Sequence, residues 1–439
     1  MFTVFTNKEK YIKWAKNIFS AIYNRALTII IQLITLPILL KYLGKSSYAE
    51  WLLLTSIPAY LSTSDLGINV TVTTKICSLV AQSKYDEALQ LYKSANKLFL
   101  IIALSGTFVV SILIYFIDWK TILNISQFSP DEISYALLFL SLGMFIAPIL
   151  GLCQGVFKSE GRLDLFQNSI TLQQLVEALT STILLIFTKN IVIVSISYII
   201  IKALFLVSTI IFLEKRYYWY KFGIKSRLSH SLKLVPISIH YMIALVGQSL
   251  FIQGPILLIG KYLGSSSLII FTTSRTLTNA GKSIASIFYS SFVVDYTYKL
   301  AKKEFSEASK LFNKVLLITS FGSFFITIFL FLFGPKLISI WTKHEVYVDT
   351  TFFNILCISS TFSTINNCCY SILSSTNQNK NIGFFYLFSS VALLIFMSLF
   401  SSKSLQTYAY LILFIEFCQL LASYIESKKV LNGNRILFK

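Results

Sequence analysis

Two basic residues, Arg275 and Lys282, stand within a long apolar segment, where a charged side chain is costly unless it faces a cavity or a partner. Their separation of seven residues places them on one helix face, with Thr278 and Asn279 between them. A guanidinium and an ammonium on one face suit a polyanion such as a diphosphate, because both donate charge-assisted hydrogen bonds. In the alternative interpretation, Lys282 extends to the cytoplasmic interface and Arg275 meets Glu416, a carboxylate in a later apolar segment.

Four further ionisable residues fall in apolar segments of the first half and form two candidate pairs. Arg25 and Asp65 are each about 20 residues from a chain reversal near residues 44–45. Glu177 and Lys202 are each about 12–13 residues from a turn at residues 189–190. Residues equally far from a short loop lie at one depth in a helical hairpin. Each pair is therefore either a structural ion pair or the site of a carboxylate that releases a proton.

These considerations define two sets of candidate site residues. The candidates for anion binding are Arg275, Lys282, Arg25 and Lys202. The candidates for ion coupling or ion pairing are Asp65, Glu177 and Glu416.

The sequence has no motif that indicates catalysis or a metal site. It lacks a Gly-rich phosphate loop, a nucleophile motif and a cluster of metal ligands, and it contains only three histidines. Its six cysteines lack the paired spacing of a zinc site or a disulfide framework and are typical of small buried apolar residues. We therefore expect a protein that is not an enzyme and has no cofactor or metal.

Long apolar segments must position these charges. The 439 residues are 55% hydrophobic and 13% charged, with mean hydropathy +0.70, whereas a soluble domain has about 25% charged residues. Apolar runs of about 20 residues can cross a bilayer as helices, and they lack the alternation of barrel strands. The sequence therefore predicts an all-α integral membrane protein with about twelve transmembrane helices, at 18–40, 48–69, 97–117, 135–157, 165–187, 191–213, 234–260, 265–290, 314–333, 351–375, 382–400 and 405–425.

Basic residues are unequally distributed between the two sides of these spans. An even number of spans places both termini on one side, and the loops of that side contain 27 Lys and Arg against 8 in the opposite loops. Since cytoplasmic loops are enriched in Lys and Arg, both termini are predicted to be cytoplasmic. The same distribution accounts for the formal net charge of +19 without a nucleic-acid partner.

Two motifs recur at one displacement of 220 residues. Lys41-Tyr-Leu-Gly44 recurs as Lys261-Tyr-Leu-Gly264, and the segment 84–92 resembles 304–312. Two matches at one offset indicate two homologous halves of six spans each. We predict an N-terminal lobe at 1–213, a basic cytoplasmic linker at 214–233 and a C-terminal lobe at 234–439 with a short basic tail. In transport folds of parallel halves, the substrate path lies between the lobes.

Three short motifs carry a resemblance to a known family. The stretch from Pro37 to Trp51 contains Leu-Gly-x-x-x-Tyr-x-x-Trp, Asp65-Leu-Gly67 follows it, and Ser159-Glu-Gly-Arg162 comes after the fourth span. Over its whole length the chain resembles the Wzx-type O-antigen and polysaccharide flippases of the multidrug/oligosaccharidyl-lipid/polysaccharide (MOP) exporter superfamily. The resemblance implies a MATE-like fold of two six-helix lobes around a central, often cationic cavity. Of the candidate residues, only Asp65 lies in one of these motifs.

The resemblance also implies an activity. A relative of these flippases would move an undecaprenyl-diphosphate-linked oligosaccharide, such as an O-antigen or capsule repeat unit, from the cytoplasmic to the periplasmic leaflet by alternating access. It would lie in the bacterial inner membrane and use a proton or sodium gradient. Expected partners are the polyprenyl-diphosphate-linked glycan, the lipid bilayer and other polysaccharide-assembly membrane proteins.

Two other functions compete with this expectation. A drug or small-cation antiporter of the same fold would favour a net-acidic cavity, whereas the spans contain four basic and three acidic candidates. An O-antigen polymerase, a membrane glycosyltransferase, would normally need a larger periplasmic loop than the predicted topology provides.

Overall fold

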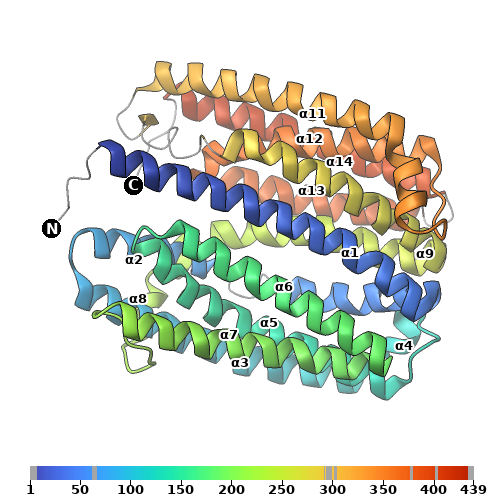
Figure 1. The fold of residues 1–439 in the computed structure, drawn as a ribbon, viewed down its shortest axis with the longest axis horizontal. Coiled ribbons are helices and arrows are strands. Elements are labelled where there is room, and N and C mark those ends of the chain that lie inside the picture. Colours follow the sequence, from blue (N-terminus) through green and yellow to red (C-terminus); the bar gives the residue numbers. More distant parts are fainter. Residues whose placement is uncertain are drawn as a thin grey trace. The chain divides into compact units, whose positions relative to one another are not determined.

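The computed structural model describes residues 7–61, 67–290, 292, 299–300, 304–375, 379–400 and 404–433. In these ranges the regular secondary structure is helical, which confirms the all-α fold class (Figure 1). The helices are α1 (Asn7–Leu61), α2 (Ile68–Ala81), α3 (Tyr85–Phe116), α4 (Trp119–Ile122), α5 (Pro130–Ser159), α6 (Leu163–Thr188), α7 (Ile191–Arg216), α8 (Ser229–Leu232), α9 (Val235–Ser290), α11 (Phe305–Trp341), α12 (Thr350–Ser375), α13 (Lys380–Leu399) and α14 (Leu405–Leu431).

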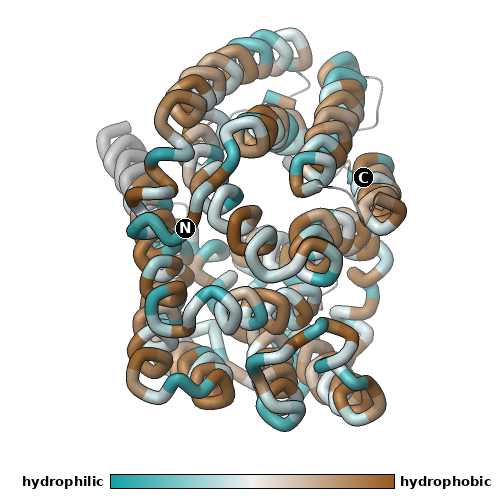
Figure 2. The backbone as a smooth tube through the Cα atoms, turned by 90° about the vertical axis from the view of Figure 1, so that its right-hand side faces the viewer, coloured by the Kyte–Doolittle hydropathy of each residue, from teal (hydrophilic) through white to brown (hydrophobic). Residues whose placement is uncertain are grey.

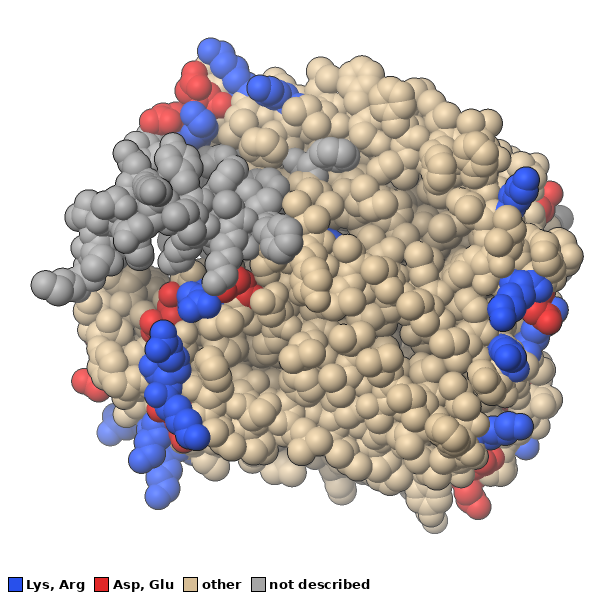
Figure 3. All heavy atoms as spheres, viewed as in Figure 1, with Lys and Arg blue, Asp and Glu red and all other residues tan. Residues whose placement is uncertain are grey.

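Most of the long helices are apolar enough to span a membrane. Nine such helices occur in the described ranges, namely α1, α3, α5, α6, α7, α9, α11, α13 and α14. In Figure 2, hydrophobic residues, in brown, make up much of the helical backbone. Many of their large apolar side chains are exposed, as Phe108 of α3 and Phe325 of α11 illustrate. In the face shown in Figure 3, charged side chains gather at the helix ends and the surface between them is almost uncharged. The chain is therefore a multi-pass membrane protein.

Two of these helices are long enough to account for two predicted spans each. The apolar part of α1 has 40 residues and that of α9 has 47, about twice the length that one crossing needs. Each is interrupted by one glycine, Gly44 (φ 77°, ψ 164°) in α1 and Gly264 (φ 78°, ψ 178°) in α9. Only glycine adopts this conformation readily. The total of twelve spans and the cytoplasmic location of both termini remain predictions.

The two interruptions belong to the repeated Lys-Tyr-Leu-Gly motif. In each copy the lysine Nζ lies over the ring of the next tyrosine, 5.3 Å from its centroid for Lys41 and 5.6 Å for Lys261. The repeat recognised in the sequence therefore has the same backbone break and the same cation–π contact in both copies.

The chain forms two compact units that do not follow chain order. Unit 1 comprises residues 1–35, 57–122 and 128–242, and unit 2 comprises 36–56, 123–127 and 243–439. Segment 36–56 packs within unit 2, where Leu53 lies against Gly260 and the Glu50 carboxylate accepts hydrogen bonds from the backbone of Ser126 and Gln127. These units are defined by contacts between residues and not by chain order. The division of the sequence into lobes at 1–213 and 234–439 therefore remains a prediction.

The segment predicted as a basic linker packs closely on unit 1. Trp219 and Tyr220 are buried in the core of that unit. Tyr220 Oη lies 2.5 Å from Tyr92 Oη of α3, and Trp219 Nε1 donates to Glu160 over 2.6 Å. Burial of two aromatic rings with their polar atoms paired makes this segment part of the folded unit.

In unit 2, a close helix approach assembles the candidate site. At Gly247 of α9, an added Cβ would lie only 2.6 Å from the backbone nitrogen of Leu387 in α13. Glycine therefore lets the two backbones come together. The neighbouring residues Gln248 and Tyr386 are thereby brought to the same pocket.

Candidate functional site

Arg275 and Lys282 of α9 line a single pocket inside unit 2, with a cavity volume of about 290 Å³. The opposite walls come from α12, α13 and α14, which pack together in the same unit. Besides the two cations, the polar residues that line the pocket are Gln248, Thr278, Asn279, Ser359, Ser360, Ser363, Asn366, Asn367, Tyr386, Glu416 and Gln419. The seven-residue spacing therefore does place both cations on one wall, as predicted.

Arg275 is held in position by groups that leave most of its donors available. Its Nη1 donates to the carbonyl oxygen of Ile252 over 2.7 Å. Its guanidinium carbon lies 5.6 Å from the centroid of the Phe271 ring on the preceding turn. A guanidinium has five N–H donors, so this arrangement orients its plane and leaves donors for a guest.

Lys282 and Glu416 are connected through a serine of α12. The Lys282 ammonium donates a hydrogen bond to Ser363 Oγ, and Ser363 also interacts with the Glu416 carboxyl group. Glu416 is 7% exposed. Across the described residues, no ion pair within 4.0 Å joins it to either cation. The alternative in which Arg275 directly pairs with Glu416 is therefore not realised, although both cations act on this carboxylate electrostatically.

Amide side chains supply much of the remaining polarity. Tyr386 Oη donates to Asn366 Oδ1 over 3.0 Å, and Gln419 Nε2 donates to Ser389 over 2.9 Å. Gln248, Asn279 and Asn367 also line the pocket. In the described ranges, these three form no side-chain hydrogen bond, so their donors and acceptors remain available to a polar ligand.

Glu177 and Lys202 form the predicted ion pair in unit 1. Lys202 Nζ lies 2.9 Å from Glu177 Oε1, and both side chains are largely buried. Gln173 donates to the same carboxylate oxygen over 2.9 Å, and Lys202 Nζ lies 5.4 Å from the centroid of the Tyr198 ring. The pair is thus satisfied within its own unit, which agrees with the structural interpretation.

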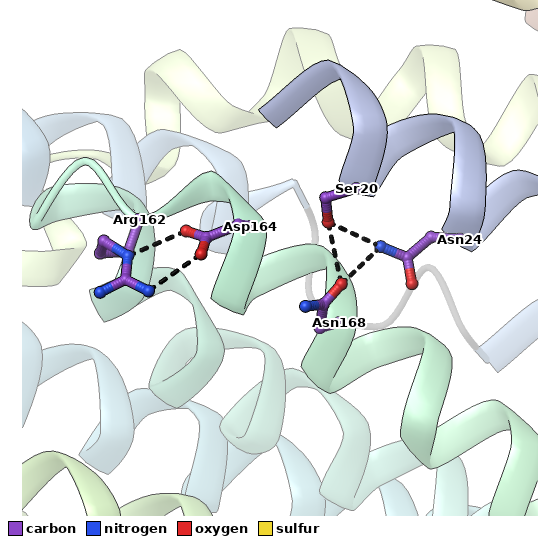
Figure 4. Close-up of polar contacts among 5 residues, drawn as sticks. All are labelled: Ser20, Asn24, Arg162, Asp164 and Asn168. Carbon is purple, nitrogen blue, oxygen red and sulfur yellow. Dashed lines mark hydrogen bonds and ion pairs between the residues drawn. The ribbon is translucent and has the colours of Figure 1, made fainter. Parts of the chain in front are cut away.

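The other predicted pair joins Arg25 to Asp65, which lies outside the described residues. Arg25 of α1 is exposed. Its neighbour Asn24 is buried and joins α1 to α6, where Asn24 Nδ2 donates to Asn168 Oδ1 over 2.7 Å (Figure 4). All residues that line the described pocket belong to unit 2, whereas Arg25 and Lys202 belong to unit 1.

The last residue of the Ser159-Glu-Gly-Arg162 motif forms an ion pair at the start of α6. Arg162 Nε and Nη2 each donate to the Asp164 carboxylate over 2.9 Å at the start of α6 (Figure 4). Asp164 is 5% exposed, so this bidentate pair secures the turn between α5 and α6.

Several pocket residues were not among the sequence candidates. Ser359, Ser363 and Asn366 of α12 follow one another at intervals of four and three residues. This spacing places them on one helix face, so a polar stripe in the predicted span 351–375 could have identified them. Tyr386 has no such signal, because it stands among the aromatic residues of an apolar span.

Comparisons with known proteins agree with this architecture. A family model described as polysaccharide biosynthesis protein matches residues 14–294, more than half of the chain. The inward-facing structure of a multidrug resistance MATE family transporter of the MOP superfamily is similar with a TM-score of 0.72 and 12% identity, over 95% of this chain and 98% of the other. MATE in the bent conformation gives 0.69 and 11%, over 96% and 95%. Comparison with curated proteins returns no significant match.

Proposed function

We propose that this chain flips a lipid-linked oligosaccharide. The premise is that it belongs to the polysaccharide biosynthesis protein family and is a MOP-superfamily transporter with a MATE-like fold. The substrate would be a glycan repeat unit joined through a diphosphate to undecaprenol. It would move from the cytoplasmic to the periplasmic leaflet of the bacterial inner membrane by alternating access, with an ion gradient as the energy source. The protein acts as a transporter rather than an enzyme in this proposal.

The observation that carries the proposal is the pair of cations on one wall of the pocket. Arg275 and Lys282 face a polar cavity whose one carboxylate, Glu416, forms an ion pair with neither of them. A diphosphate esterified at both ends carries two negative charges, which these two cations match. The guanidinium can bind two phosphate oxygens at once, and the ammonium supplies a compact second charge.

The size of the pocket agrees with a head group rather than a whole glycan. A volume of about 290 Å³ lies at the lower end of the range for ligand sites. We therefore assign to this pocket the diphosphate and the sugar next to it. The amide groups of Gln248, Asn279 and Asn367 would then bind sugar hydroxyls, and the lipid tail would stay in the bilayer.

A drug or small-cation antiporter is the competing function for this fold. Its cavity would have to attract a cation, whereas the described pocket has two basic groups and one acidic group. Glu416 is the one feature in the pocket that would suit such a substrate. The experiment below distinguishes the two functions, because it measures glycan accumulation and drug resistance in the same cells.

The proposal is tested by translocation in cells that lack the native protein. We expect Arg275→Ala/Lys282→Ala to abolish glycan export and to leave lipid-linked repeat units in the inner leaflet, with unchanged protein levels in the membrane. Lys261→Ala is the matched control, since it removes a charge from the same helix outside the pocket. Full export by the double variant would refute the role of the pocket. Drug resistance conferred by the wild-type protein, without glycan accumulation in its absence, would favour the antiporter.

A further inference from the structure

Glu416 is a buried carboxylate set between the two cations and groups from every helix that lines the pocket. Arg275 and Lys282 face it from α9, Ser363 faces it from α12 and Tyr386 from α13. On its own helix, the next polar pocket residue, Gln419, is engaged by Ser389. Helix α11 also packs on α14, but none of its titratable side chains lines the pocket. The charges that act on Glu416 in the described site are therefore the two cations.

The charge balance of this pocket changes when an anion binds. Without a guest, and at a pH at which Glu416 is ionised, the two positive charges and the carboxylate sum to a net charge of +1. A diphosphate diester brings two negative charges, so the occupied pocket would have a net charge of −1 if Glu416 stayed ionised. It would be neutral if Glu416 were protonated. Uncompensated charge is costly inside a membrane protein, and a second anion close to a carboxylate favours its protonated form.

We infer that Glu416 takes up one proton from solution when the pocket binds its anion, so that substrate and proton occupy the site together. This inference rests on the proposed function. Lys282 leaves Ser363 and turns to the diphosphate beside Arg275, while the Glu416 carboxylate takes up the proton. Ser363 can accept from Lys282 in the empty state, and its hydroxyl can accept from the protonated Glu416 once Lys282 has turned to the anion.

Coupled binding has a consequence for the direction of transport. For an uncharged glycan, the dianion and one proton together carry a net charge of −1 from the cytoplasm to the periplasm. The loaded pocket is itself neutral, so a membrane potential that is negative inside acts on the return of the empty pocket rather than on this outward step. The empty pocket, with its net charge of +1, is drawn back toward the cytoplasmic side by the same potential. Proton and substrate would thus move together, and the membrane potential would supply the driving force.

The experiment measures proton uptake on binding to the full-length protein in lipid nanodiscs. The probe is a symmetrical dialkyl diphosphate, because both of its phosphates are diesters and keep constant charge over the pH range studied. Calorimetric titrations in buffers of different ionisation enthalpy give the number of protons bound. We expect about one proton for the wild-type protein where free Glu416 is ionised, and an affinity that falls by up to about tenfold per pH unit.

Three variants assign the proton to its residue. Glu416→Gln should bind the probe without proton uptake and with an affinity independent of pH. Glu416→Asp keeps a titratable group and should restore the uptake, which distinguishes titration from a structural effect. Glu345→Gln is the matched control, because Glu345 is an exposed carboxylate of unit 2 that pairs with Lys45 outside the pocket.

The outcomes separate the inference from the proposed function. Binding by the wild-type protein without proton uptake would overturn the inference and leave the anion site intact. Undiminished uptake by Glu416→Gln would overturn it as well, since the proton would reside elsewhere. Failure of the wild-type protein to bind the probe, with a folded protein, would instead refute the anion pocket on which the proposed function depends.

Discussion

The chemistry of the candidate site depends on which groups hold each charged side chain in position. Arg275 is oriented by the carbonyl of Ile252 and the ring of Phe271, whereas Lys282 is held by Ser363. The two cations are therefore not equivalent. The arginine offers a planar fork of donors, and the lysine offers a compact charge on a flexible stem.

The difference between the cations predicts the effect of conservative exchange. Arg275→Lys keeps the charge but loses the planar fork, so we expect affinity for a dialkyl diphosphate to fall about tenfold, or about 1.4 kcal/mol. Lys282→Arg, which keeps a charge at the neighbouring position, should weaken binding less. Calorimetric titration of both variants makes the comparison. Equal affinities for Arg275→Lys and the wild-type protein would show that charge alone matters.

The buried pair in unit 1 predicts a characteristic pattern of stabilities. Lys202→Met should destabilise the protein by about 3–5 kcal/mol, because it leaves the Glu177 carboxylate largely buried without its cation. The double variant Glu177→Gln/Lys202→Met should recover much of this loss, since no unpaired charge remains. Unfolding of the purified variants in detergent measures both. If the single and double variants were equally unstable, packing rather than charge would explain the effect.

At the scale of elements, glycines determine where helices turn and where they touch. Gly44 and Gly264 interrupt α1 and α9 with positive φ angles, and an added Cβ would meet no atom within 4 Å at either position. Gly247 has the opposite requirement, since its surroundings leave no space for a Cβ. The first two are needed for backbone conformation and the third for close packing of α9 on α13.

The backbone requirement predicts equal costs at the two equivalent breaks. Gly44→Ala and Gly264→Ala should each destabilise the protein by about 1–3 kcal/mol, through backbone strain rather than collision. Gly143→Ala is the matched control, because a Cβ there makes only ordinary contacts at 3.9 Å and the residue lies inside α5. Thermal unfolding in detergent tests the three variants. Loss of stability in the control but not at the breaks would contradict this account.

The packing requirement predicts an effect on the pocket itself. Gly247→Ala should separate α9 from α13 next to Gln248 and Tyr386, so we expect weaker diphosphate binding together with reduced stability. Binding and unfolding measured on the same preparation test this expectation. A variant with wild-type affinity would show that the pocket tolerates displacement of these helices.

At the scale of the whole molecule, the distribution of charge predicts orientation in the membrane. The 27 basic residues of one set of loops, against 8 in the other, predict that both termini are cytoplasmic. A green fluorescent protein fused to the C-terminus should therefore fluoresce. Alkaline phosphatase fused after Asn190, in the predicted periplasmic turn, should be active, because it requires export. The reverse pattern would invert the topology and with it the proposed direction of transport.

The sequence by itself determined the membrane character of the chain, its all-α fold class, and the repeat that ends at Gly44 and Gly264. These features are local, since apolar length, helical period and a glycine-specific backbone conformation are properties of short segments. The same local reasoning placed Arg275 and Lys282 on one helix face and matched Glu177 with Lys202 in depth.

Only the tertiary structure decided what faces the two cations. Ser363 reaches the pocket from α12 and Tyr386 from α13, and contacts such as that of Gly247 with α13 bring these helices to the cations of α9. The structure also showed that Glu416 lies beside the cations without an ion pair to either, and that Trp219 and Tyr220 tie the predicted linker to unit 1. Helical period specifies which residues share a face, but packing between helices decides which faces meet.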